Sequence, residues 1–90
     1  MNQAGLIEAR MLELLAARSP DASICPSDVA RTLASDTDGW RALMEPVRDV
    51  ARALAERGVV VITQGQQVVG PAAPVKGPIR LRRGPAFDAR

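Results

Sequence analysis

Residues 40–64, WRALMEPVRDVARALAERGVVVITQ, decide the fold of this chain. Apolar residues recur in the first part of this segment at steps of three and four, the spacing of one helix face. Gly58 follows, at the position where helices commonly stop. The strand-forming residues 59–63 come directly after it. The segment therefore predicts a long amphipathic helix over about 40–57 that leads straight into a β-strand over 59–64.

Pro46 interrupts this helical pattern. A proline inside a helix removes one backbone hydrogen bond and clashes with the turn before it. We therefore expect either a kink at this point or a short helix followed by a second one that starts at Pro46.

Two further helices are predicted before Trp40. The first covers about 3–17 and has Ile7, Met11 and Leu15 on one side. Residues 23–25 are long enough for a minimal strand. The second helix begins near Pro26, because proline suits the first position of a helix.

Two short segments after residue 64 complete the predicted sheet. Residues 67–69 can form a return strand after a turn at Gly65, and residues 78–82 alternate between apolar and basic. Helices followed by such strands are typical of a winged helix-turn-helix. We predict an α+β fold with three helices and a small two- or three-stranded antiparallel sheet. One winged-helix domain covers 1–82, and 83–90 is a flexible C-terminal tail.

Composition narrows the possible functions. The 90-residue chain has no histidine, which is the commonest general base and metal ligand, and its single cysteine, Cys25, excludes an internal disulfide. A lone thiol suits a reducing compartment, and no apolar run is long enough to span a membrane. We expect a cytoplasmic protein that is not an enzyme, with no cofactor, metal or small-molecule substrate. Cys25 is interpreted as a small buried hydrophobe.

The charges of the chain are polarised. Residues 1–39 hold three arginines and six acidic residues, and residues 58–90 hold five basic residues and one acidic residue. In a helix-turn-helix the second helix enters the major groove, where arginine reads guanine, and cations on a wing follow the phosphates. We therefore predict duplex DNA binding. The candidate contacts are Arg41, Arg48 and Arg52 on the helix, with Lys76, Arg80, Arg82 and Arg83 at the wing.

Other interpretations stay open. Glu45 and Asp49 would repel phosphates, and Asp49 is spaced to pair with Arg52, so this helix face is equally typical of a self-neutralised surface. Cations on an edge strand also discourage aggregation. The alternative function is a protein-interaction or homodimerisation module, in which the first helix, with Leu12 off its main stripe, pairs with a copy of itself. Trp40 is expected to be a core anchor rather than a stacking platform.

Three blocks of sequence carry a resemblance. They are ICPSDVAR at 24–31, WRALM at 40–44 and GPIRLR at 77–82. Together they resemble a small bacterial family of unknown function whose members are similar to winged-helix domains. The resemblance covers nearly the whole chain and implies the fold. It implies no catalytic or binding residues, because fold alone does not define function.

Overall fold

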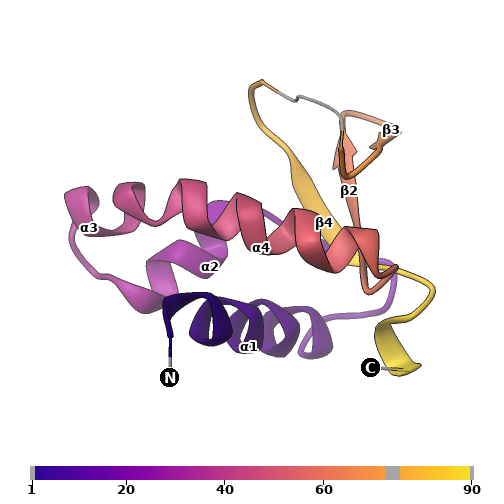
Figure 1. Cartoon of the computed structure of the whole chain (residues 1–90), viewed down its shortest axis with the longest axis horizontal. Helices are drawn as coiled ribbons and strands as arrows, with labels where there is room; N and C mark the ends of the chain where they lie inside the picture. The colour runs from indigo at the N-terminus through magenta and orange to yellow at the C-terminus, as the bar shows by residue number, and fades with distance from the viewer. Residues whose placement is uncertain (1, 73–75, 90) are drawn as a thin grey trace.

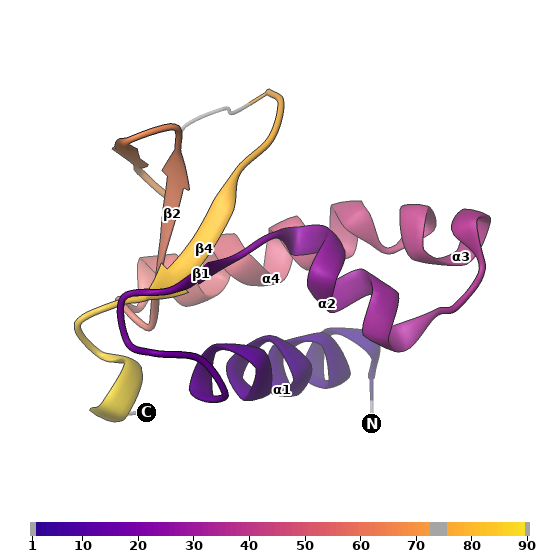
Figure 2. The same ribbon diagram turned by 180° about the vertical axis from the view of Figure 1, so that it is seen from behind.

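The helices and strands follow one another along the chain in the order expected. The structure, a computed structural model, describes residues 2–72 and 76–89. Its elements are α1 (Gln3–Ala16), β1 (Ser23–Ile24), α2 (Pro26–Leu33), α3 (Thr37–Ala42), α4 (Met44–Glu56), β2 (Val60–Gln64), β3 (Gln67–Val69), β4 (Arg80–Arg83) and the 3₁₀ helix η1 (Phe87–Ala89). Figure 1 shows α1 and α4 lying side by side with the sheet at one end, and Figure 2 shows the same arrangement from behind.

The predicted helix over 40–57 is two helices, α3 and α4. Inside a helix, the ring of a proline clashes with the carbonyl four residues earlier. For Pro46 that carbonyl belongs to residue 42, and α3 ends at this residue. Pro46 then occupies the first turn of α4, where its missing N–H is harmless. The break lies two residues before Pro46, and α3 starts three residues earlier than predicted. Asp36 caps it by accepting a hydrogen bond from the Gly39 N–H.

The sheet is antiparallel and has four strands in the order β1-β4-β2-β3, one strand more than the sequence predicts. The two-residue β1 lies within residues 23–25, which the sequence marked as long enough for a minimal strand, and it pairs with β4 far along the chain. Ile24, Leu81 and Ile62 lie opposite one another across three strands and are buried. This row therefore faces the helices.

The other face of the sheet carries no helix. We call it the open sheet face; across the strands its residues are Ser23, Val61, Thr63, Val68, Arg80 and Arg82. Val68 is 64% exposed, whereas Ile62 on the helix side is 4% exposed. The sheet thus separates an apolar core from a mixed surface that holds two arginines.

Aliphatic side chains from every layer build the core. The buried set is Ile7, Met11, Leu15, Ile24, Val29, Ala30, Val47, Val50, Ala51, Leu54, Val59, Val60, Ile62, Ile79, Leu81 and Phe87. Trp40 packs against this cluster and is half-buried, so the expected core anchor lies at the edge of the core. Leu12 also packs against the cluster, whereas Leu6 is the exposed leucine of α1.

Residues 83–89 pack against the domain, in contrast to the flexible tail expected from residue 83. Arg83 belongs to β4, and the Gly84 and Ala86 N–H groups donate to the Val59 and Gly58 carbonyls at 2.9 Å each. Phe87 is 3% exposed. Burial of an aromatic ring is strongly favourable, and this explains why a segment with Gly84 and Pro85 folds back on the core. The folded unit therefore extends beyond residue 82.

Candidate nucleic-acid interface

The predicted site residues fall into separate groups. Arg48 on α4 contacts Gly77, next to Lys76 in the β3–β4 connection; Arg52 lies one turn further along α4, and Arg41 lies on α3. Arg80 and Arg82 belong to the open sheet face, on the opposite side of the sheet from α4. Arg83 points to the helix side. Among the described residues, the arginines of α4 and those of the open sheet face therefore belong to separate surfaces.

The group formed by α4 and the β3–β4 connection is held by side-chain contacts. The Arg48 Nη2 donates to the Gly77 carbonyl at 2.5 Å, and the Gln64 Nε2 donates to the Lys76 carbonyl at 2.6 Å. Gly77 has φ +89°, a conformation that favours glycine. These bonds fix the backbone at Lys76 and Gly77, and the Lys76 side chain is exposed.

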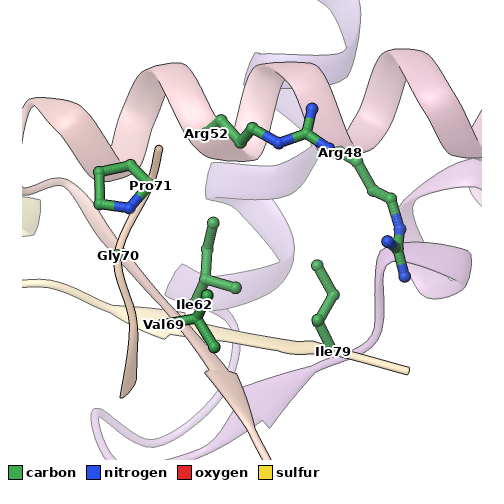
Figure 3. A pocket seen from close by; sticks show the side chains of 7 residues that line it. All are labelled: Arg48, Arg52, Ile62, Val69, Gly70, Pro71 and Ile79. Atoms are coloured by element: carbon green, nitrogen blue, oxygen red, sulfur yellow. The ribbon is translucent and has the colours of Figure 1, made fainter. Parts of the chain in front are cut away.

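A small cleft separates α4 from this part of the sheet. Figure 3 shows that Arg48 and Arg52 come from the helix, with Arg48 extending toward the segment just before β4 that carries Ile79. The opposite wall is Ile62, Val69, Gly70 and Pro71. The cavity measures about 10 Å³, room for a single water. This cleft therefore does not accommodate a small-molecule substrate.

Acidic side chains share the outer surface of α4 with the arginines. Glu45, Asp49 and Glu56 are exposed, and Arg52 donates to the Asp49 carboxylate at 2.6 Å. The i,i+3 pair expected from the sequence is thus present. Part of the positive charge of this helix is therefore neutralised locally, at Arg52.

Arg80 and Arg82 have different surroundings although both belong to the open sheet face. The Arg80 Nε and Nη2 donate to the Ser23 hydroxyl and carbonyl at 2.7 and 2.9 Å, and its Nη1 donates to the Cys25 Sγ at 2.9 Å. Cys25 is therefore half-buried as a hydrogen-bond acceptor, rather than fully buried as expected. Within residues 2–72 and 76–89, the Arg82 side chain has no hydrogen bond or ion pair, so it presents its charge to solvent.

Arg83 has a structural role that its sequence position does not reveal. Its guanidinium donates to the carbonyls of Leu15, Ala16 and Arg18, with the shortest bond, 2.8 Å, to Arg18. These carbonyls lie at the C-terminal end of α1, where helix carbonyls lack partners and a cation is favoured. The guanidinium also lies 4.8 Å from the Phe87 ring centroid. Arg83 is thus a cap of α1.

Arg31 joins Arg41 around Trp40, a contact that the sequence analysis missed. The guanidinium carbon of Arg31 lies 4.5 Å from the indole centroid, and that of Arg41 lies 5.7 Å from it. Arg31 comes from the last turn of α2, so the contact depends on how α2 packs against α3. No local spacing in the sequence signals it.

Other possible sites are limited. In the described parts of the chain, no group of three or more histidine, cysteine or acidic residues is placed to hold a metal ion. A larger, open groove of about 430 Å³ lies between the start of α1 and α4, lined by Gln3, Ala4, Pro46, Asp49, Val50 and Ala53. Asp49 is the one charged residue among those that line the groove.

The structure thus defines a small α+β domain whose candidate residues are charged side chains at its surface. The chain belongs to the family DUF3253, described as a protein of unknown function, which matches residues 4–84. No curated protein matches the sequence. None of the helices that the structure describes is long and apolar enough to cross a membrane.

Proposed function

We propose that this protein is a nucleic-acid-binding module that contacts duplex DNA through α3, α4 and the β3–β4 connection, as a winged helix-turn-helix does. The observation that carries the proposal is the hydrogen bond from Arg48 to Gly77, which joins α4 to the connection at the residue after Lys76. Figure 1 shows the β2–β3 hairpin and the start of this connection standing on the side of α4 away from α1. A helix and a wing on one side match the way such domains straddle a groove and its phosphates.

Within this proposal the residues have distinct roles. Arg48 and Lys76 contact phosphates beside the groove, and Arg41 extends the contact along α3. Arg82 supplies a separate cation on the open sheet face, suited to nonspecific attraction of DNA. Arg52 contributes less because Asp49 pairs with it, and Arg80 and Arg83 support the fold.

The proposed activity is binding alone, without catalysis or a cofactor. It implies a cytoplasmic location, which agrees with the lone thiol of Cys25.

Fluorescence anisotropy of a labelled mixed-sequence duplex, titrated at several salt concentrations, tests the proposal. We expect the logarithm of the binding constant to fall linearly with the logarithm of salt concentration. Lys76→Gln should lower the slope of that plot by about 1, because one phosphate contact is lost. Arg18→Gln is the matched control, since Arg18 is an exposed arginine beyond the end of α1. An absence of binding at low salt, or binding insensitive to salt, contradicts the proposal.

A protein-interaction module is the second candidate. It is favoured by the exposed acids Glu45, Asp49 and Glu56 on α4, which oppose phosphate binding but suit a basic protein surface. The homodimer version needs an exposed apolar stripe on α1, and there Leu6 is exposed while Leu12 packs against the core. Light scattering at high protein concentration separates the versions, since a strict monomer excludes the homodimer.

A further inference from the structure

We propose that Arg31, Trp40 and Arg41 form a clamp for one phosphate of the DNA backbone. This inference rests on the proposed function and names a contact point that lies outside α4 and the wing. The two guanidinium carbons lie 4.5 and 5.7 Å from the centroid of the same indole ring. Both arginines are exposed, so their charges are accessible from solvent.

The arginines of this clamp lack acidic partners. Within the residues that the structure describes, neither Arg31 nor Arg41 forms an ion pair. Asp36 is occupied by the Gly39 N–H at the start of α3, and Asp38, one turn before Arg41, does not pair with it. Two like charges held near one ring repel each other unless an anion lies between them. The clamp is therefore a place where an added negative charge is stabilised.

Trp40 orders the two arginines. It is half-buried and packs against the core, so the ring is held in place. The negative face of an indole attracts guanidinium groups, which restrains their side chains before any ligand arrives. Restraint of this kind lowers the entropy lost on binding.

The chemistry of guanidinium selects phosphate as the ligand. Its planar set of N–H donors matches the oxygens of a phosphate with two parallel hydrogen bonds. A single phosphate has enough acceptor oxygens for two arginines. The clamp lies where α2 meets α3, and in a helix-turn-helix the first helix of the pair crosses the sugar–phosphate backbone. A backbone phosphodiester is thus the ligand that fits both the charge and the position.

The sequence supplies a direct reporter of this site. Trp40 is the single tryptophan of a chain with no tyrosine, so intrinsic emission excited at long wavelength reports on the clamp alone. We expect an unlabelled mixed-sequence duplex to change the Trp40 emission over the concentration range in which a labelled duplex gains anisotropy. Arg31→Gln should weaken duplex binding several-fold and lower the salt slope by less than about 1, because Arg41 still contacts the phosphate, whereas Arg18→Gln should leave both close to wild type. Arg31→Lys retains the positive charge but not the planar set of donors, so it should recover part of the affinity and bind more tightly than Arg31→Gln.

Arg31 and Arg41 should act together. If they hold the same phosphate, the Arg31→Gln/Arg41→Gln double variant loses less affinity than the product of the two single losses. Losses that multiply indicate two independent contacts and overturn the clamp. Circular dichroism of each variant, together with the Arg31→Lys recovery, separates lost binding from lost folding.

The remaining outcomes distinguish this inference from the proposed function. If the duplex binds by anisotropy but leaves the Trp40 emission unchanged, and Arg31→Gln matches Arg18→Gln, the clamp is refuted and DNA binding stands. If anisotropy shows no binding at low salt, both fail. If inorganic pyrophosphate changes the emission at concentrations as low as those of duplex phosphate, the site takes free phosphate compounds and its assignment to the DNA backbone is wrong.

Discussion

Two adjacent arginines, Arg82 and Arg83, should respond differently to the same substitution. Arg83→Met retains an unbranched apolar stem beside Phe87 but removes the donors to the carbonyls of Leu15, Ala16 and Arg18. One good charged hydrogen bond is worth about 1.5 kcal/mol, and a cation at a helix C-terminus about 0.5 kcal/mol. We therefore expect Arg83→Met to lower the free energy of unfolding by about 2 kcal/mol.

Arg82→Met is the matched control. Arg82 is exposed and, in the described chain, its side chain has no partner, so its replacement should change stability by less than about 0.5 kcal/mol. Urea unfolding followed by Trp40 emission measures both values, and thermal unfolding should show Arg83→Met lower by about 10 °C. If the two variants unfold at the same urea concentration, the cap of α1 contributes nothing and our interpretation of Arg83 is wrong.

Other predictions concern the C-terminal segment. Gly84→Ala should destabilise the fold by about 2 kcal/mol, because the added Cβ would lie 2.3 Å from the Gly58 carbonyl oxygen. Gly70→Ala is the control: no atom lies within 4 Å of its added Cβ, so it should be close to neutral in the same urea titration. Equal stability of these two variants would contradict the close approach of Gly84 to Gly58. Phe87→Ala should cost about 3 kcal/mol, since it empties a buried ring site, and calorimetry showing a loss below about 1 kcal/mol would mean that the segment is a loose tail after all.

Local patterns predicted the elements of the fold well. The ends of β3 coincide with the predicted 67–69, and α1 and α2 begin where predicted, because turn glycines, Pro26 and the apolar steps act within a few residues. The outward direction of Arg80 and Arg82 followed from alternation along one strand. The family match over 4–84 agrees with the resemblance found from three sequence blocks.

Contacts between distant segments were not predictable from those patterns. The cap that Arg83 provides joins β4 to the end of α1, and the Arg31 contact depends on the packing of α2 on α3. Residues 83–89 have loop-like composition, so the burial of Phe87 is visible only once the core that receives it is known. Basic residues that looked equivalent along the chain therefore proved to have different roles.

The lengths of the outer strands have a consequence for self-association. The sheet ends in β1 with two residues and β3 with three, so neither border offers enough unpaired backbone groups to template a further strand. Val68 is exposed on one of these borders, yet a copy docking there would gain few ladder bonds. The short outer strands therefore oppose the stacking of chains into fibres, whatever charge these strands carry.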